Sequence, residues 1–373
     1  MLYLKLSVYD LNLAKEIRMV NKKDENKITF ILGGMGNGGA ERVVSILANY
    51  YAKKGKIVDI ITLLSSNSTY KLEPNVRIIS LVQENIPGKL KIIGWVNGLR
   101  RYYKKNRPYR IISFFAKINI VVMLSLLNHI GDLVVSERND PSKDGRGCIV
   151  RFLTRLLYPK TKKVVFQTKW AQSCFSSKVV ANSEIVENPV TEITTQNIKK
   201  TKSIVNVGKL SDQKNHELLI KAFSRITNEF PNHKLIIYGE GSNRKKLESM
   251  INKLELSGKI KLPGWEAEVH KKIEQAELFV LSSDYEGFSN ALLEAMMIGI
   301  PCISTDCAGS NELIKHNVNG LLTPIGNIDE LVSRMKILLN NPRFADKLGT
   351  QGKIDVEQFG VSKIVGRWES VIE

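Results

Sequence analysis

The sequence predicts an α/β protein built from two parallel-sheet domains. Short apolar runs of strand length alternate along the chain with longer stretches of helical composition, which is the pattern of βα units in parallel sheets covered by helices. A polar segment at 191–202, after Asn188-Pro189-Val190, divides this alternation into two sets and is interpreted as a linker. The length of 373 residues suits about two domains.

The first set predicts a domain at 27–190, preceded by an extension at 1–26 that lacks the pattern of a signal peptide. The apolar run at 118–130 is interrupted by polar residues and is shorter than the ~20 residues that span a bilayer, so it predicts a buried helix. A helix is also expected at 40–54, before Gly55. Strands are expected at 27–32, 57–64, 76–81, 111–115, 133–136 and 164–167.

The second set predicts a domain at 203–356, and residues 357–373 are expected to form a helix that packs back on the first domain. Parallel-sheet domains bind ligands beyond the C-terminal ends of their strands, so the two domains should face each other across a ligand-binding cleft. Helices are expected at 216–230, 243–254 and 291–298, and strands at 203–207, 234–238, 259–262, 278–281 and 301–305.

The excess positive charge lies almost entirely in the first half of the chain. Of the net +18, residues 1–190 carry 31 Lys+Arg against 14 Asp+Glu, and residues 191–373 carry 24 against 23. The stretch from Lys89 to Lys117 holds nine basic residues and no acid, with Trp95, Tyr102 and Tyr103 interleaved. This pattern is typical of a surface that lies on anionic lipid headgroups, although a solvated basic face has the same composition. No RNA- or DNA-binding motif accompanies it, so nucleic acid is not expected as a partner.

Two candidate cofactor patterns are set aside. The four cysteines form no C-x-x-C pair and have no zinc spacing with a histidine, so they are interpreted as free thiols in a reducing cytoplasm. Gly34-Met-Gly36-Asn-Gly38-Gly39 matches the dinucleotide fingerprint literally. The acid that binds ribose should end the second strand, whereas Asp59 lies near its start, so no nicotinamide or flavin site is expected. The glycine turn still lets the backbone approach a phosphate closely.

The most informative stretch is 284–297. It places Glu286 and Glu294 eight positions apart across a strand-to-helix turn, with Ser289 and Asn290 where a helix N-cap is expected. The free N–H groups at a helix start attract an anion. An anion site flanked by two carboxylates suits a ligand that is part phosphate and part polyhydroxyl, such as a nucleotide-sugar.

Two lysines, Lys209 and Lys214, follow the strand at 203–207 in the loop that begins at Gly208. Each alone is typical of a protein surface. On a strand-end loop both ammonium groups can point into the cleft, where they would neutralise a leaving diphosphate beside the two glutamates.

These residues resemble a retaining glycosyltransferase of family 4, with the GT-B architecture of two facing Rossmann-like domains. The resemblance covers residues 27–370, and its most specific part is the Glu-x7-Glu segment with its flanking Gly-Phe and Leu-Leu-Glu-Ala-Met. In chain order the matching segments are Gly38-Gly39-Ala-Glu-Arg42, Val165-Phe-Gln-Thr168, Asn188-Pro-Val190, Gly208-Lys-Leu, Lys214-Asn215, Tyr238-Gly-Glu-Gly241, Leu262-Pro-Gly264, Glu286-Gly-Phe-Ser-Asn290, Pro301-Cys-Ile-Ser-Thr-Asp306, Asn311-Glu-Leu-Ile314 and Gly320-Leu-Leu322.

The resemblance implies that Glu286, Lys214 and Lys209 are the catalytic residues, with both lysines on the diphosphate and Glu286 beside the transferred sugar. The family usually has arginine in place of Lys209, so charge is kept while bidentate geometry is lost. Glu294 is expected to accept from the nucleotide ribose. No metal or cofactor is expected, because the lysines and the helix end replace a divalent cation. The other expected contacts of the nucleotide-sugar are Gly39, Gly264, Gly287, Phe288, Ser289 and Asn290.

The acceptor side is expected in the loop after the fifth strand, which has no histidine where some relatives carry one. The candidates are Gly38, Glu137, Arg138, Asn139 and Asp140, and the alternative is a polar loop held only by Pro141. This loop and the G-G-A-E-R segment resemble bacterial enzymes that extend undecaprenyl-diphosphate-linked oligosaccharides, including some N-acetylgalactosaminyltransferases.

The sequence therefore predicts a hexosyltransferase that moves a hexose or N-acetylhexosamine from a UDP-sugar to a lipid-linked saccharide, in bacterial polysaccharide, O-antigen, capsule or glycan biosynthesis. It is expected in the cytoplasm, bound peripherally to the inner face of the cell membrane through the basic stretch. Two alternatives stay open: a non-transferring GT-B enzyme such as a nucleotide-sugar epimerase, and an inactive membrane-bound scaffold.

Overall fold

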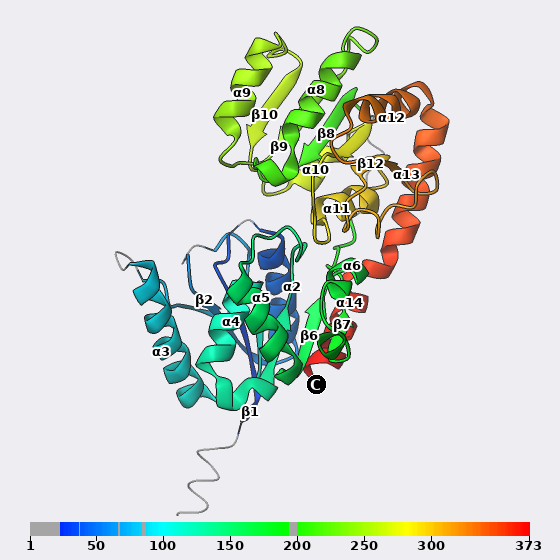
Figure 1. Cartoon of the computed structure of the whole chain (residues 1–373). Helices are drawn as coiled ribbons and strands as arrows, with labels where there is room; N and C mark the ends of the chain where they lie inside the picture. The colour runs from blue at the N-terminus through cyan, green and yellow to red at the C-terminus, as the bar shows by residue number, and fades with distance from the viewer. Residues whose placement is uncertain (1–22, 37, 66–67, 84–86, 194–199) are drawn as a thin grey trace, which may run out of the picture.

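The computed structural model describes residues 23–36, 38–65, 68–83, 87–193 and 200–373. They form two parallel α/β units, one above the other in Figure 1, which confirms the predicted fold class. Residues 1–22 of the expected extension and 194–199 of the expected linker lie outside the described residues.

The first unit holds a seven-stranded parallel sheet in the order β3-β2-β1-β4-β5-β6-β7. Its strands are β1 Asp24–Leu32, β2 Ile57–Thr62, β3 Val76–Ser80, β4 Pro108–Phe114, β5 Leu133–Ser136, β6 Lys163–Phe166 and β7 Ser183–Ile185. Its helices are α2 Gly39–Lys53, α3 Gly88–Asn106, α4 Ala116–Ser125, α5 Cys148–Leu157, α6 Lys169–Ser173 and α7 Ser177–Val180.

The second unit holds a six-stranded parallel sheet in the order β10-β9-β8-β11-β12-β13. Its strands are β8 Ser203–Val207, β9 Lys234–Tyr238, β10 Ile260–Gly264, β11 Leu278–Leu281, β12 Cys302–Thr305 and β13 Leu321–Thr323. Its helices are α8 His216–Ile226, α9 Arg244–Lys253, α10 Val269–Ile273, α11 Asn290–Ile298, α12 Ile328–Asn340 and α13 Pro342–Val356. Both sheets point the C-terminal ends of their strands toward the boundary between the units, where ligands of such folds bind.

Three differences from the sequence-based expectation have local causes. The edge strands β7 and β13 were not predicted, because each is three residues long and carries no apolar run of strand length. β1 begins at Asp24, ahead of the expected start, since its backbone pairs with the strand that follows Arg107. The run at 118–130 is not one helix: α4 ends at Ser125 and a 3₁₀ segment follows at Leu127–Asp132.

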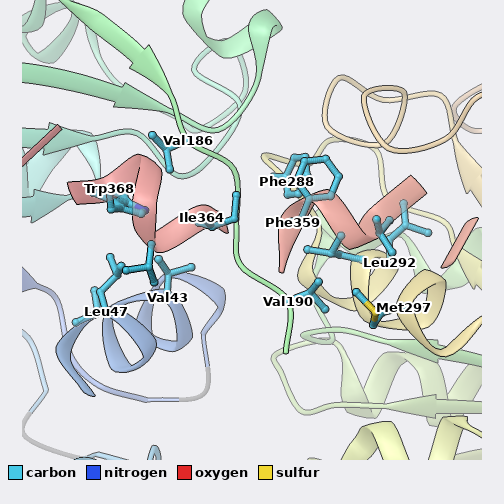
Figure 2. Packing of buried hydrophobic residues seen from close by; sticks show 14 of the residues in the cluster. Val43, Leu47, Val186, Val190, Phe288, Leu292, Met297, Phe359, Ile364 and Trp368 are labelled. Atoms are coloured by element: carbon cyan, nitrogen blue, oxygen red, sulfur yellow. The ribbon is translucent and has the colours of Figure 1, made fainter. Parts of the chain in front are cut away.

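A continuous core joins the two units through the C-terminal helix α14, Val361–Ile372. Figure 2 shows Trp368 and Ile364 beside Val43 and Leu47 of α2. On the other side of the same cluster, Phe359 meets Phe288 edge to face at 5.3 Å. The carbonyl of Ile372 accepts from Arg110 Nε at 2.7 Å, which fixes the end of the helix to β4.

Replacing Trp368 by alanine is expected to lower the free energy of unfolding by about 3–5 kcal/mol. The indole is fully buried and lies 6.1 Å from the ring of Phe114, so its loss leaves a cavity in the core that joins the units. Urea unfolding measures the effect, and Lys363→Ala on the exposed side of the same helix is the control. A W368A protein as stable as the control would show that α14 is not part of the core.

Candidate active site

The turn before α11 has the form that the sequence predicts. β11 ends at Leu281, and the buried side chain of Ser289 caps the helix by accepting from the backbone N–H of Leu292 at 3.4 Å. The helix ends at Gly299, which takes the left-handed conformation with φ +88°. Six of the seven residues from Leu292 to Ile298 are apolar and all seven are buried, so packing holds the start of the helix in place.

Glu286 and Lys214 lie together at this turn. Lys214 Nζ donates to Glu286 Oε1 at 2.5 Å, and Ser283 Oγ donates to the same oxygen at 2.5 Å. The carboxylate is 6 % exposed, whereas the lysine side chain keeps 18 % of its surface. A further hydrogen bond holds the loop after β8 against this turn: Ser282 Oγ donates to the carbonyl of Lys214 at 3.0 Å. The structure therefore brings together two of the three residues expected to be catalytic.

Lys209, the third, is exposed at the boundary between the units and faces Glu41 of α2. Burial raises the pKa of the Glu41 carboxyl, and the nearby charge of Lys209 partly offsets this shift. Glu41 was not among the expected site residues, although it stands in the G-G-A-E-R segment. Its carboxylate oxygen would lie 2.0 Å from a Cβ on Gly38, so a side chain at Gly38 would displace it.

Glu294 is held by the first unit. Its carboxylate forms an ion pair with Arg42 of α2, and Glu294 is 6 % exposed. Burial lowers the pKa of the Arg42 guanidinium. A nucleotide ribose that bound Glu294 would share it with this arginine. Sequence reasoning did not name Arg42 as a site residue, although G-G-A-E-R contains it.

Asn188 forms a second contact between the units, after that of Arg42, that could not be predicted from the sequence. Its Nδ2 donates to the carbonyl of Phe288 at 2.8 Å and to Asn290 Oδ1 at 2.5 Å. Asn290 Nδ2 in turn donates to the carbonyl of Gly39 at 3.2 Å. Asn290 therefore ties the glycine turn of the first unit to the start of α11, where a phosphate is expected, and Asn188 fixes the same helix start from the end of the first unit.

Close backbone approach explains the glycines of the site. A Cβ on Gly287 would lie 2.9 Å from the carbonyl oxygen of Arg138, and a Cβ on Gly39 would lie 2.9 Å from Asn290 Nδ2. Gly264 has φ +97° at the end of β10, a conformation that side chains disfavour. Gly309 was not predicted: its Cβ would lie 1.6 Å from the carbonyl oxygen of Gly287.

Replacing Gly309 by alanine is expected to destabilise the protein by about 1–3 kcal/mol and to weaken ligand binding at the turn, because the Glu286-Gly287 backbone must move. Thermal unfolding and a UDP titration measure both effects. Gly366→Ala is the matched control, since its Cβ meets nothing within 4 Å in the middle of α14. A Gly309→Ala protein that behaves like Gly366→Ala would contradict the packing described here.

The acceptor-side candidates lie in a loop whose side chains are largely engaged. Glu137 is buried, with one carboxylate oxygen accepting from Arg146 Nη2 at 2.6 Å and the other from Tyr158. Arg138 is buried with its guanidinium 5.1 Å from the ring of Trp368, and burial lowers its pKa.

The next two candidates differ in exposure. Asp140 Oδ1 accepts from the backbone N–H of Ser142 at 2.9 Å and from Trp170 Nε1 at 3.2 Å. Asn139 is half-buried, and its side chain caps the N–H of Asp140. Asn139 is therefore the candidate of this loop whose side chain has most access to a ligand.

The other sequence motifs have structural explanations. Asp59 is fully buried and accepts from Arg77 Nε at 2.7 Å and from the hydroxyl of Tyr102 at 2.6 Å, so its carboxylate is engaged within the first unit. Among the described residues, no group of three or more His, Cys, Asp or Glu side chains is arranged to hold a metal ion. Within the same residues, no helix combines the length and the hydropathy that a membrane span needs.

Comparison with known proteins agrees with this geometry. Residues 191–355 match the family model described as "Glycosyl transferases group 1". An uncharacterised glycosyltransferase of Haemophilus influenzae is 26 % identical over 93 % of this chain and 99 % of its own length. A second relative, from Campylobacter jejuni, is the N-acetylgalactosamine-N,N'-diacetylbacillosaminyl-diphospho-undecaprenol 4-alpha-N-acetylgalactosaminyltransferase, 27 % identical over 91 % of this chain and 97 % of its own.

Among solved structures, HepE of Anabaena in complex with UDP and glucose superimposes with a TM-score of 0.79. It is 17 % identical and covers 93 % of this chain and 99 % of its own, a likeness that shows the shared fold. Residues 191–355 therefore match the group 1 glycosyl transferases, glycosyltransferases are similar to this chain along almost its whole length, and the fold is the two-sheet GT-B architecture.

Proposed function

We propose that this glycosyltransferase is a retaining, metal-independent enzyme that moves a hexose or N-acetylhexosamine from a UDP-sugar to a lipid-linked saccharide. The observation that carries the proposal is the contact between Lys214 Nζ and Glu286 Oε1 at the capped start of α11. A cation from the loop after β8 thereby meets a carboxylate in the turn before α11, next to the start of that helix and to the glycine turn of the first unit.

The chemistry of this arrangement suits the loss of a nucleoside diphosphate. When the bond between the sugar and the β-phosphate breaks, negative charge develops on the phosphate. Lys214, Lys209 and the N–H groups at the start of α11 would stabilise this charge, because all of them carry full or partial positive charge. Catalysis without a divalent cation would follow from this set of donors.

Glu286 would contact the sugar that is transferred. Its carboxylate is buried beside Lys214 and Ser283, so it would accept from sugar hydroxyls or stabilise positive charge on the anomeric carbon as the leaving group departs. Glu294, Gly39, Gly264 and the residues Gly287 to Asn290 would complete the donor site, with Gly38 and Asn139 at the acceptor side.

The identity of donor and acceptor rests on the relatives and on charge. HepE was crystallised with UDP and glucose, and the Campylobacter jejuni relative acts on an undecaprenol-linked saccharide. The excess of basic residues in the first half of this chain suits an acceptor that carries a diphosphate at an anionic membrane surface, with the protein bound peripherally to the inner face.

A donor screen tests the proposal. The purified protein is incubated with UDP-glucose, UDP-galactose and their N-acetyl forms, with and without a membrane extract as acceptor source, and the release of UDP is measured with and without EDTA. We expect acceptor-dependent release from one of these donors that EDTA does not stop. Conversion of a UDP-sugar without acceptor would indicate an epimerase, and a protein that does not bind UDP at all would refute the proposal.

A further inference from the structure

A cavity lies in the first unit, beside α5. It has a volume of about 610 Å³, within the range of small-molecule sites. Its walls come from the loop after β5, from α5 and from the segment around α6 and α7, and they contain three arginines and no acidic residue. The residues that matter for its chemistry are Arg146, Arg151, Arg155, Trp170 and Cys174.

Two of the three arginines are available to a ligand. Arg146 is neutralised by Glu137 and Asp144, at 2.6 and 2.5 Å. Arg151 and Arg155 are exposed and form no ion pair among the described residues, and Arg151 Nε donates to the carbonyl of Arg146 at 3.3 Å. The cavity is therefore positively charged, and a guanidinium binds phosphate with two parallel hydrogen bonds.

The helix beside the cavity is apolar on its exposed side. Ile149, Phe152 and Leu156, at positions that share one side of a helix, are 75 %, 65 % and 49 % exposed. The adjoining side of α5, with Leu153 and Leu157, packs into the core of the unit. On the surface of α5, Arg151 and Arg155 lie between the cavity and the exposed apolar side. A ligand that fits this surface carries an anionic group next to a hydrocarbon chain.

The cavity also adjoins the loop after β5, and the first residues of this loop lie at the boundary with the second unit. The carbonyl of Arg138 lies against Gly287, and Pro141 and Ser142, a few residues further along, line the cavity. Trp170, which lines it from the other side, donates its backbone N–H to Glu312 of the second unit at 3.1 Å. The cavity and the turn before α11 therefore border the same loop of the first unit.

We propose that this cavity binds the diphosphate of a polyprenyl-linked acceptor, with Arg151 and Arg155 as its cationic contacts and the prenyl chain along Ile149, Phe152 and Leu156. The inference rests on the proposed function, since it assigns the lipid end of the acceptor whose saccharide enters the cleft. It assigns the prenyl chain to α5, separately from the basic stretch of α3, which is expected to lie on anionic headgroups.

Farnesyl diphosphate, a short polyprenyl diphosphate, is a suitable probe. We expect calorimetric titration to show binding to the full-length protein that weakens at least about tenfold in the double variant R151A/R155A, because two charge-assisted contacts are lost. The matched control is K104A/K105A, which removes the same charge from exposed positions of α3. Inorganic pyrophosphate and farnesol each lack half of the ligand and should bind more weakly than farnesyl diphosphate.

Cys174 supplies a second readout at the cavity itself. In a C148S background it is the one exposed cysteine, because Cys302 and Cys307 are buried. Farnesyl diphosphate should slow the reaction of Cys174 with N-ethylmaleimide, and this protection should be lost in R151A/R155A. Protection that persists in R151A/R155A would overturn the assignment of the arginines.

UDP titration of the same variants separates this inference from the proposed function. R151A/R155A should bind UDP as the wild type does, which also shows that it is folded. If the wild type binds farnesyl diphosphate but not UDP, the proposed function fails while the cavity stands. If R151A/R155A loses binding to phosphatidylglycerol vesicles but not to farnesyl diphosphate, the surface binds the bilayer and the diphosphate site is refuted.

Discussion

Replacing Lys214 by alanine is expected to weaken UDP binding by about 10- to 100-fold and to abolish sugar transfer, as a charge-assisted contact contributes about 1.5–3 kcal/mol. The ammonium group lies 2.5 Å from Glu286 Oε1 at the start of α11, where the diphosphate is expected. Its loss removes a cation from the leaving group and leaves the buried carboxylate with Ser283 as its remaining partner. Calorimetry gives the UDP affinity, and UDP release gives the rate.

The comparison variants make this result specific. Lys214→Arg keeps the charge and should retain part of the affinity, whereas Lys253→Ala, at an exposed position of α9, should change nothing. Because Lys214→Ala also breaks an ion pair, the melting temperature of each variant has to be compared. A folded Lys214→Ala protein with unchanged UDP affinity would remove Lys214 from the donor site.

Replacing Glu286 by glutamine is expected to lower the rate of transfer by about 100- to 1000-fold, the usual cost of losing one group that stabilises a transition state. The affinity for UDP should change much less, because glutamine keeps the size and the hydrogen-bonding oxygen while the charge beside the anomeric carbon is removed. Glu286 is 6 % exposed and is paired with Lys214, so we expect it to act on the sugar rather than on the nucleotide.

Single-turnover rates and UDP titrations of the same preparation distinguish the two effects. A Glu286→Gln protein with a wild-type rate would exclude Glu286 from the chemistry, and one that loses UDP affinity to the same extent as rate would assign it to nucleotide binding. An inactive scaffold is excluded by any measurable difference in rate between the wild type and this variant.

Most of the fold could be predicted, because a short run of apolar residues indicates a strand that is buried in a sheet. β11 is a continuous apolar run and β5 is apolar up to Ser136; both are buried along their whole length, and their bounds agree with those expected. The strands β7 and β13 could not be found in this way, since each lies at a sheet edge and pairs on one side only. Their existence depends on the neighbouring strand rather than on their own composition.

The arrangement of the candidate site could be predicted where its residues lie close together in the sequence. Ser289 and Glu286 lie within a few residues of each other on a strand-turn-helix unit, so local rules of capping place them. The contacts of Arg42 with Glu294 and of Asn188 with Asn290 join residues 252 and 102 positions apart, and they depend on how the two units close. No local pattern contains that information, although both residues stand in segments that resemble the family.

The loop after β5 shows a question that its sequence leaves open. Four consecutive polar residues suggest ligand contacts, yet Glu137, Arg138 and Asp140 are buried and hold the loop against Arg146, Trp368 and Trp170. A charged residue in a loop near a cleft is as often a support for the backbone as a contact for a ligand. Burial, which the sequence does not report for isolated polar residues, decides between the two.

A crystal structure of the protein with UDP tests the central claim most directly. We expect the diphosphate to lie between the ammonium groups of Lys209 and Lys214 and the first N–H groups of α11, with the ribose near Glu294. Diphosphate density at any other place in the molecule, with Lys214 still paired to Glu286 and the start of α11 without a ligand, would contradict it.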